Sequence, residues 1–368
     1  IEGDGPGVAR ALASELGGSV VEHERFLTAS VETPRHGRID VVTARTERYE
    51  RPGALPRVLP GSMAQDLRRR DFTVNAMAIE LGSGAFGLLD PLGGVADLER
   101  RRLRILHPLS FVEDPTRMLR AARYAARLDL ATDRWTLRCQ ALALRLAPYP
   151  ALSGARVAAE LERLLREPEP GAALALLARA GVVRLLDSRW RPGRATAARL
   201  AAVAATLAWA TAERLATPLT VAVLALAAEQ RPEVAAALPE RLGLSGELVG
   251  RIRRALEEAP HLAARIRASS PPSETARLLR DAGAVAVVLL HLTEPSSRNR
   301  LEWYAREGRT VAPALTGDEV IALGVARGPM VREVLQTLRD GRLDGRFADR
   351  ESEIRYVRAV TLRDERKG

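Results

Sequence analysis

The sequence predicts an α+β fold, in which a small α/β head is followed by an elongated all-helical part. Three observations lead to this class. Residues 1–80 hold short runs rich in Val, Ile and Thr between turn residues, as strands do. After Asp114 the chain consists of Ala- and Leu-rich stretches separated by Pro or Gly, a pattern typical of successive helices. The 368 residues are also too many for one core, which seldom exceeds ~250–300 residues.

The head is expected to begin with one helix and three strands. Apolar residues recur at helical spacing over Pro6–Leu16, and Gly17 with Gly18 forms a helix-stop signal. Alternating segments enriched in β-branched residues then predict three short strands. These strands are Ser19–Glu22, Phe26–Glu32 and Arg38–Thr43.

Turn residues and short apolar runs divide the next stretch. Glu47–Gly61 holds three prolines and two glycines, and we expect a mobile loop there. Thr73–Ile79 has the composition of a further strand. Leu88–Leu106 alternates apolar runs with a Pro/Gly turn and a charged stretch, which predicts strand, turn, short helix and strand in that order.

Arginine dominates the charge of the chain. Lysine and arginine number 56 against 46 acidic residues, the formal net charge is +10, and Lys367 is the only lysine. A positive balance of this size favours a polyanionic partner, and arginine suits phosphates because it forms forked hydrogen bonds. A GC-rich genome also produces an Ala- and Arg-rich composition, so the charge alone leaves nucleic-acid binding open.

Composition also predicts a cytoplasmic protein. Apolar residues make up 46% of the chain, which excludes a disordered protein. The sequence has no uncharged apolar run of the ~18 residues that a membrane span needs, and no signal peptide is recognised. The lone Cys139 fits a reducing compartment.

A helix with an arginine-rich side is predicted after Asp114. Asp followed by Pro115 is a helix-start signal, because proline suits the first helical position. Four arginines fall within about a third of the helix circumference: Arg117, Arg120, Arg123 and Arg127. The opposite arc carries Met118, Ala122, Ala125 and Ala126. We therefore expect this helix to pack on one side and to offer guanidinium groups on the other.

Asp114 and Arg117, one turn apart, suit the recognition of a nucleobase. A carboxylate accepts a hydrogen bond from the exocyclic amine of cytosine or adenine, while a guanidinium donates to the neighbouring ring nitrogen. Uracil and guanine have the opposite polarity, so such a pair would accept C and A only. In the alternative interpretation, Asp114 is the N-cap of its helix and the arginines form a solvated face.

The segment Arg68–Asn75 is a second candidate for nucleotide contact. Three consecutive arginines before Asp71 can hold a triphosphate or a ribose by forked hydrogen bonds, with Asn75 as a further polar contact. Because a predicted strand follows, we expect Arg70 and Asp71 to lie at a strand end. The alternative is a basic run on the surface.

Asp40 is a carboxylate inside the predicted strand Arg38–Thr43. A buried carboxylate needs a partner, which is either an arginine or a metal ion. Two-metal phosphoryl transfer requires several clustered acidic groups, and Asp40 is a candidate for one of them. The sequence contains no neighbouring Asp-x-Asp pair on another strand to complete the set. The alternative is a solvent-facing strand residue.

Three ordered motifs resemble one known family. They are RRRDFTVNAMA at Arg68–Ala78, LLDPLGGVADLERRRLRIL at Leu88–Leu106, and FVEDPTRMLRAARYAARL at Phe111–Leu128. Together they look like the class II tRNA nucleotidyltransferase/poly(A) polymerase family, closely from Ile1 to about Leu130 and more loosely beyond. Leu315–Arg346 is similar to the tail segment of bacterial CCA-adding enzymes and their A-adding relatives.

This resemblance implies a function and a domain order. The implied reaction is the template-independent addition of CMP and AMP, from CTP and ATP, to the 3′ end of tRNA, with Mg²⁺ as cofactor. The implied parts are a nucleotidyltransferase head at 1–82, a base-recognising neck at 83–150, a helical body at 151–270 and a tRNA-binding tail at 271–368. The loop Glu47–Gly61 would take part in switching from C to A.

The resemblance also assigns roles to individual residues. Arg70 of the RRDFT motif would contact the incoming nucleotide, together with Asp71 and Asn75. Asp114 and Arg117 would read the base, and Arg120 and Arg123 would lie near the phosphates and the sugar. Asp40 occupies the position of the third acidic strand residue of the family, which makes it the expected catalytic residue and metal ligand.

One departure from the family pattern limits these expectations. In the family, a GG…R turn and a strand with Asp-x-Asp precede a segment like the IEGDG with which this chain begins. We expect either an N-terminally incomplete chain or a lost metal site, and little catalysis by the chain as it stands. Within the same chemistry, an A-adding enzyme, a CC-adding enzyme and a poly(A) polymerase stay open. A non-catalytic RNA-binding protein is the alternative from another class.

Overall fold

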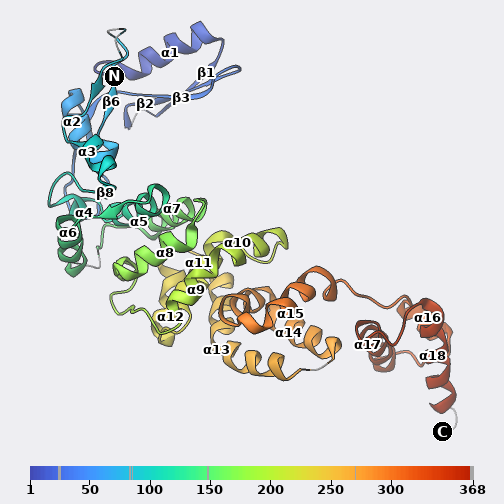
Figure 1. The fold of residues 1–368 in the computed structure, drawn as a ribbon. Coiled ribbons are helices and arrows are strands. Elements are labelled where there is room, and N and C mark those ends of the chain that lie inside the picture. The colour runs from blue at the N-terminus through green and yellow to red at the C-terminus, as the bar shows by residue number, and fades with distance from the viewer. Residues whose placement is uncertain (24–25, 83, 85, 147–148, 270, 365–368) are drawn as a thin grey trace. The chain divides into compact units, whose positions relative to one another are not determined.

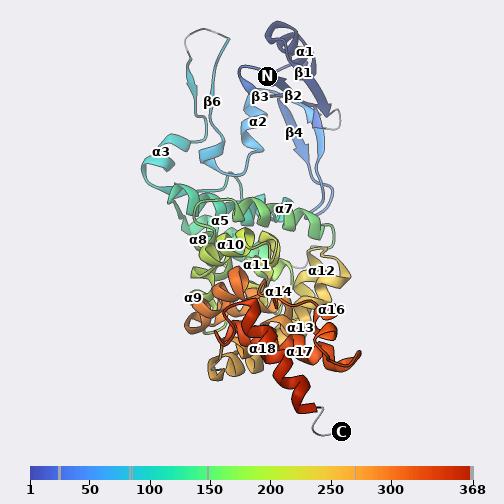
Figure 2. The ribbon, with the colours of Figure 1, turned by 90° about the vertical axis from the view of Figure 1, so that its right-hand side faces the viewer.

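The computed structural model describes residues 1–23, 26–82, 84, 86–146, 149–269 and 271–364, which fall into two compact units (Figures 1 and 2). Unit 1 consists of Ile1–Gly193 and Arg241–Gly243, and unit 2 of Arg194–Glu240 and Leu244–Gly368. In the described chain the strands belong to unit 1, whereas unit 2 is built from helices. The predicted α+β class, with an α/β head before a helical part, is confirmed. The finer division into four parts stays a prediction.

A three-stranded antiparallel sheet with one covering helix opens unit 1 (Figure 1). The elements are α1 (Gly5–Leu16), β1 (Ser19–His23), β2 (Thr28–Thr33) and β3 (Gly37–Val42), with the strands in the order β1-β2-β3. Ala9 and Ala13 of the helix pack on Ala29, Val31 and Val41 of the sheet. The predicted helix and three strands are thus confirmed, with β2 beginning two residues later than expected.

The segment predicted as a mobile loop contains a β-hairpin instead. β4 (Arg45–Arg48) pairs antiparallel with β5 (Arg57–Pro60). The turn-forming residues cluster in the connection, where Gly53 has φ 77°. Pro60 lies at the end of its strand, where a missing N–H costs little. The loop expectation for Glu47–Gly61 is therefore wrong except at the hairpin tip.

The predicted strand Thr73–Ile79 is also wrong in its first half. Thr73–Asn75 form a short 3₁₀ helix, and only Ala78–Ile79 (β6) are extended. The Thr73 hydroxyl donates to the buried Asp97 Oδ2 at 2.7 Å, which holds this segment out of a strand conformation. After it come the predicted strand, turn, short helix and strand, which are confirmed. They are β7 (Leu88–Leu89), α3 (Gly94–Glu99) and β8 (Arg102–Leu103), with β8 parallel to β9 (Ala131–Thr132).

Helices complete unit 1 and form unit 2. In unit 1 they are α2 (Met63–Arg68), α4 (Ser110–Glu113), α5 (Arg117–Leu128), α6 (Arg134–Arg145), α7 (Gly154–Leu165), α8 (Pro170–Arg179) and the 3₁₀ turn Val182–Leu185. α5 packs against both α7 and α8. Prolines at Pro170, Pro218, Pro272 and Pro329 open their helices at the first positions, as proline favours.

Unit 2 has a buried central helix and a separate small cluster. The elements are α9 (Thr196–Ala201), α10 (Val203–Ala212), α11 (Pro218–Ala227), α12 (Pro232–Arg241), α13 (Gly246–Ala268), α14 (Pro272–Thr293), α15 (Arg298–Trp303), the π-helical turn Tyr304–Gly308, α16 (Gly317–Ala322), α17 (Pro329–Leu343) and α18 (Arg350–Asp364). α11 is buried from Leu219 to Ala227. α16, α17 and α18 share their own apolar cluster around Val320, Leu338 and Val357. Among the described helices, none combines the length and the apolar content needed to span a membrane.

Candidate functional site

The triple-arginine segment and helix α5 meet in one charged cluster of unit 1. Asp71 receives a forked pair of hydrogen bonds from Arg120, at 2.6 Å from Nε and 3.0 Å from Nη2. The Nε of Arg117 lies 2.9 Å from Asp71 Oδ1, although its N–H does not point along a hydrogen bond. Forked arginine–carboxylate pairs fix both partners in orientation. The segment Arg68–Asn75 and helix α5, both singled out in the sequence, are therefore held together through Asp71.

Asp114 lies in the extended break between α4 and α5 and is 8% exposed. Its Oδ1 accepts from the N–H of Thr116 at 3.0 Å and from Arg156 Nη2 at 2.9 Å, and its Oδ2 accepts from Arg120 Nη2 at 3.0 Å. Burial by itself raises the pKa of Asp114, but Arg120, Thr116 and Arg156 outweigh this effect and hold the pKa below its ordinary value. Asp114 is consequently an ionised acceptor at neutral pH.

Arg117 is almost completely enclosed, with 2% exposure. Its Nη1 donates to Ser110 Oγ at 2.8 Å, and its Nη2 donates to the carbonyl of Arg69 at 3.0 Å. The hydroxyl of Tyr49 lies 3.5 Å from the same Nη2. The expectation that this side of the helix offers free guanidinium groups is wrong for Arg117, because the surrounding chain already accepts from them.

The other arginines of α5 are engaged by carboxylates as well. Arg120 also contacts Asp114 and Glu160, and Arg123 lies 3.5 Å from Glu167. The pKa of Arg120 is raised well above its ordinary value, because the attraction of Asp71 and the other carboxylates exceeds the effect of burial. Met118, Ala122 and Ala125 are buried on the opposite arc, as predicted. The solvated-face alternative therefore holds for Arg127 alone, whose side chain is exposed.

The N-cap alternative for Asp114 is wrong, because the N-cap of α5 is Thr116, which has no side-chain cap hydrogen bond. The carboxylate bonds the N–H and the hydroxyl of Thr116, the residue before the first turn of α5. It does so while also accepting from Arg120 and Arg156. The same two oxygens thus hold Thr116 in front of α5 and pair with two arginines.

Arg70 and Asn75 differ from these enclosed groups. Arg70 pairs with Asp66 at 2.8 Å, yet its side chain is 43% exposed. The Oδ1 of Asn75 is buried, and no hydrogen-bond donor reaches it within the described chain. A buried amide oxygen without a donor is costly, which makes Asn75 an acceptor open to a ligand. Arg70 and Asn75 thus both have polar groups that a ligand can bind.

Asp40 lies apart from the cluster, on the face of the sheet that α1 does not cover. Its side chain is 56% exposed, so the expectation of a buried carboxylate is wrong and the solvent-facing alternative is correct. Ser30 Oγ donates to its Oδ1 at 2.7 Å and Arg38 Nε at 2.9 Å, and these two donors lower the pKa of Asp40. No group of three or more metal-ligating side chains is present among the described residues.

Reasoning from the sequence missed the residues that connect the hairpin tip to Asp114. Arg156 of α7 donates from Nη1 to the carbonyl of Gly53 at 2.6 Å and from Nη2 to Asp114. The N–H of Gly53 donates to the carbonyl of Glu113 at 3.1 Å. An arginine in a predicted helix gives no signal of partners 42 and 103 residues away in the chain. Only the folded chain reveals this connection.

Comparison with known proteins places these features in context. The sequence pattern of the family described as "Poly A polymerase head domain" matches residues 1–104. The A-adding tRNA nucleotidyltransferase of Geobacter sulfurreducens is 33% identical over 379 residues, which cover 99% of this chain and 42% of the relative. The CC-adding tRNA nucleotidyltransferase of Deinococcus radiodurans is 37% identical over 358 residues, covering 97% of this chain and 82% of the relative. The chain therefore spans less than half of the A-adding relative and most of the CC-adding one.

Solved structures show the same fold. An apo form of a CCA-adding enzyme matches with a TM-score of 0.85 and 28% identity, over 98% of this chain and 86% of the other. The Thermotoga maritima CCA-adding enzyme, solved in complex with tRNA, matches with a TM-score of 0.77 and 26% identity, over 98% and 85% of the two chains. The arrangement of elements described above is thus shared across nearly the whole chain.

Proposed function

Because this chain belongs to the family of tRNA nucleotidyltransferases and poly(A) polymerases, we propose that it serves the template-independent addition of CMP or AMP to the 3′ end of tRNA. The substrates would be CTP or ATP and a tRNA. In the reaction, the terminal 3′ hydroxyl oxygen forms a bond to the α-phosphorus, the bond to the leaving pyrophosphate breaks, and the hydroxyl proton is lost. A cytoplasmic location goes with this proposal.

The observation that carries the proposal is the junction of the RRRD segment with helix α5. Asp71 is held by Arg120 in a forked pair, and Arg117 donates to the Arg69 carbonyl. One structure thus combines a segment that offers Arg70 and Asn75 with a segment that carries Asp114 and Arg117. A nucleoside triphosphate needs both, since its base and its phosphates are recognised by different chemistry.

We assign base selection to Asp114 and Arg117. The ionised carboxylate is the acceptor for the exocyclic amine of C or A, and the guanidinium is the donor for the ring nitrogen. In the present arrangement both groups bond their own chain, to Arg156 and Thr116 and to Ser110 and Arg69. Binding of a base would exchange some of these partners for base atoms, and it would cost little where the exchanged contact is long, such as the 3.5 Å approach of Tyr49.

We assign the phosphate and sugar contacts to Arg70 and Asn75, whose polar groups are not all bonded within the chain. Arg70, half exposed, can form a second fork with a phosphate without losing Asp66, since a guanidinium has five donors. Asn75 offers its buried oxygen to a sugar hydroxyl. Arg120 would act on the phosphates mainly through its charge, because carboxylates already accept from its N–H groups, whereas Arg123 has an Nε without a partner in the described chain.

Phosphoryl transfer of this kind also calls for a divalent metal ion. Nucleotidyltransferases of this family generally use divalent metal ions, and we propose Mg²⁺ with Asp40 as one ligand. Asp40 is exposed and ionised, which suits a ligand, but Arg38 already pairs with it. No group of three or more His, Cys, Asp or Glu side chains placed to hold a metal ion is found among the described residues, so they do not by themselves form a complete magnesium site.

A direct test uses the full-length protein and three tRNA substrates. The tRNAs end at the discriminator base, at C and at CC, and each is incubated with one nucleoside triphosphate at a time. CCA addition predicts extension of all three, CC addition extension of the first two with CTP alone, and A addition extension of the third with ATP alone. Long A tails on any RNA would indicate a poly(A) polymerase. Binding of tRNA without extension would support the non-catalytic RNA-binding alternative and overturn the enzymatic proposal.

A further inference from the structure

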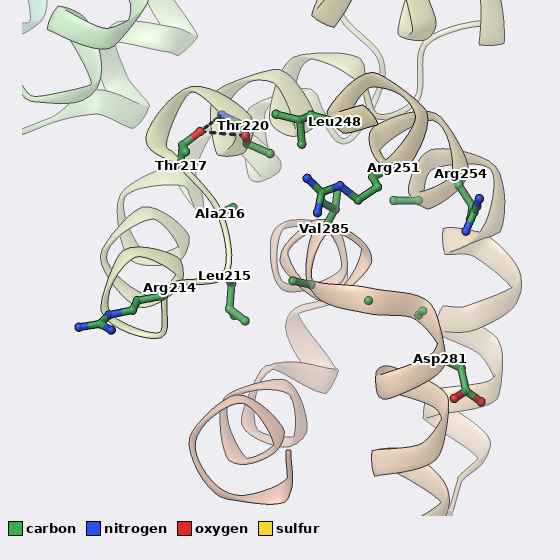
Figure 3. A pocket seen from close by; sticks show the side chains of 14 residues that line it. Arg214, Leu215, Ala216, Thr217, Thr220, Leu248, Arg251, Arg254, Asp281 and Val285 are labelled. Carbon is green, nitrogen blue, oxygen red and sulfur yellow. Dashed lines mark hydrogen bonds between the residues drawn. The ribbon is translucent and has the colours of Figure 1, made fainter. Parts of the chain in front are cut away.

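Unit 2 contains an open pocket that takes no part in the site described above (Figure 3). Its volume is about 550 Å³. The residues on which the argument rests are Arg214 after α10, Thr217 and Thr220 at the start of α11, Arg251 and Arg254 of α13, and Gly283 of α14. The pocket is therefore built by the ends and sides of four helices.

Positive charge around this pocket is poorly compensated. Arg214 and Arg254 form no ion pair within the described part of the chain, and Arg251 only approaches the exposed Glu247 at 3.8 Å. Asp281 is the one acidic residue of the lining, and its side chain is 70% exposed. Arg251 and Arg254, three residues apart on α13, project from the same side of that helix. Figure 3 shows Arg251 beside Val285 at the pocket and Arg214 with its guanidinium turned outward at the opposite rim.

The wall of the pocket has an unusual backbone at two places. Gly283 has φ 79° and ψ 167°, a conformation that only glycine adopts readily, and it breaks α14 into two helical halves. Arg214, at the opposite side, has φ 54°, which is uncommon for a residue with a side chain. The second half of α14 begins beside the pocket at Ala284, and the first turn of a helix favours anions. Two residues of the pocket wall thus adopt backbone conformations that cost free energy.

The lining suits a phosphate and not a base. Besides arginines and one aspartate, the lining residues are Thr217, Thr220, glycine and aliphatic side chains, with no aromatic ring to stack on a base and no amide to read its edge. The hydroxyls of Thr217 and Thr220 lie 2.9 Å apart and add polar groups beside the cations. Phosphate oxygens accept from guanidinium and hydroxyl groups alike.

We propose that this pocket binds a backbone phosphate of the RNA substrate, with Arg251 and Arg254 as the direct contacts. The inference rests on the proposed function, which supplies a long polyanion as substrate. Arg214 contributes charge at the rim. Because no lining group reads a base, the contact is independent of RNA sequence.

The test measures tRNA binding by the purified chain, so that it requires no catalysis. Arg251→Ala and Arg254→Ala are compared with Arg253→Ala, a neighbour on the same helix that does not line the pocket and pairs with Glu240. We expect each pocket variant to weaken tRNA binding about three- to tenfold and to lower the slope of log Kd against log salt by about one, as the loss of one phosphate contact does. Arg253→Ala is expected to keep both quantities close to the wild-type values. Thermal melting checks that all three variants are folded.

Each outcome decides between the alternatives. Equal tRNA affinity and salt slope in the pocket variants and in Arg253→Ala would overturn the phosphate assignment, while tRNA binding by the wild type would leave the proposed function intact. Unchanged tRNA binding together with weaker binding of ATP or pyrophosphate would replace the RNA backbone by a small phosphate ligand and so overturn the RNA assignment. Absence of tRNA binding by the wild type would remove the RNA inference and the proposed function together.

Discussion

Asp114 is the most heavily engaged residue of the proposed site, because one carboxylate holds Thr116, pairs with two arginines and is the proposed base acceptor. Asp114→Asn keeps its shape but replaces one acceptor oxygen by a donor group. We expect the variant to bind CTP and ATP with reduced preference over UTP and GTP, by about tenfold, the equivalent of one charged hydrogen bond. Isothermal titration with the four nucleotides measures the preference.

A matched variant separates this effect from a general loss of charge. Arg127→Ala removes an exposed cation from the same helix without touching the cluster. It is expected to leave the order of the four nucleotides unchanged. If Asp114→Asn also left that order unchanged, the assignment of base selection to Asp114 would be wrong.

His291 is a buried histidine whose titration affects the stability of unit 2. It is 1% exposed, stacks on Trp209 with 4.2 Å between the ring centroids, and contacts Thr206 at 2.8 Å and Glu302 at 3.2 Å. Burial lowers its pKa below the ordinary 6.5, although Glu302 acts in the opposite direction. The unfolded chain therefore takes up this proton first. Its contribution to stability is full above pH 6.5 and is lost as the pH falls below that value, by at most about 1.4 kcal/mol per pH unit.

Urea unfolding at pH 7.5 and 5.5 tests this dependence. His291→Gln is expected to show a smaller loss of unfolding free energy between the two pH values than the wild type. His261→Gln, at an exposed position of α13, is the control and is expected to behave like the wild type. An identical pH dependence in His291→Gln and the wild type would rule out His291 as the titrating group.

At the scale of elements, Arg156 ties the tip of the β4–β5 hairpin to the break between α4 and α5. Its two Nη atoms bond the Gly53 carbonyl and Asp114. Arg156→Ala removes one charge-assisted hydrogen bond to the tip, which is worth about 1.5–3 kcal/mol. We expect amide exchange in residues 49–56 to be at least about tenfold faster, as measured by mass spectrometry. Arg163→Ala, which removes an exposed arginine of the same helix, is expected to leave this exchange rate unchanged.

The break in α14 at Gly283 leads to a prediction about stability. Gly283→Ala forces a side chain into a conformation reserved for glycine, at a cost of about 1–3 kcal/mol, although a Cβ atom there meets nothing within 4 Å. The loss of stability is thus expected from backbone strain alone. Gly250→Ala, in the regular part of α13 and equally free of neighbours, is expected to stabilise by about 0.5–1 kcal/mol. Opposite shifts of the melting temperature are the expected result, and equal shifts would contradict the strain argument.

Sequence patterns predicted the elements whose signals are local. α1 ends at Gly17, whose φ of 64° is the left-handed stop that the sequence indicated. The strand expected at Thr73–Ile79 failed because Thr73 bonds Asp97, a residue 24 positions away. β4 and β5 were missed because Arg45–Arg48 and Arg57–Pro60 have no apolar alternation, and their pairing depends on the packing around them. Contacts between residues far apart in the chain cannot be predicted from local composition.

The same distinction applies to the candidate site. Asp114 and Arg117 were singled out by their spacing and their chemistry, and the structure brings them to the RRRD segment. Their enclosure could not be foreseen, because it depends on groups 40 or more residues away in the chain: Arg156, which donates to Asp114, and the Arg69 carbonyl, which accepts from Arg117. Asp40 was expected to be buried on the basis of apolar neighbours, but alternation places it on the opposite face of the strand.

For the whole molecule, the count of 56 lysines and arginines overstates the number of cations that face solvent. Arg117, Arg120 and Arg123 are enclosed by acidic partners, so they contribute little to attracting RNA from solution. Exposed arginines such as Arg251 and Arg254 are instead accessible to a polyanion. Charge counted from the sequence does not distinguish the two groups.

The dependence of tRNA affinity on salt concentration tests the role of the exposed arginines. If exposed arginines hold the RNA backbone, log Kd for tRNA should rise linearly with log salt concentration, with a slope of about 0.9 for each phosphate neutralised on a double helix. Affinities between 50 and 200 mM salt, measured by filter binding, give the slope. A flat response would show that the helical units do not hold RNA through its phosphates.

The course of the chain between units 1 and 2 also limits where a chimera with a relative can be joined. Arg241–Gly243 belong to unit 1, although the 47 residues before them, Arg194–Glu240, belong to unit 2. The Arg241 carbonyl sits so close to the start of α7 that a methyl group on Gly154 would come within 1.7 Å of it. In a chimera joined at a single crossover after Gly193, Gly154 of one parent would therefore lie against Arg241–Gly243 of the other parent. Exchanges between relatives are expected to succeed when Gly154 and Arg241–Gly243 are inherited from the same parent.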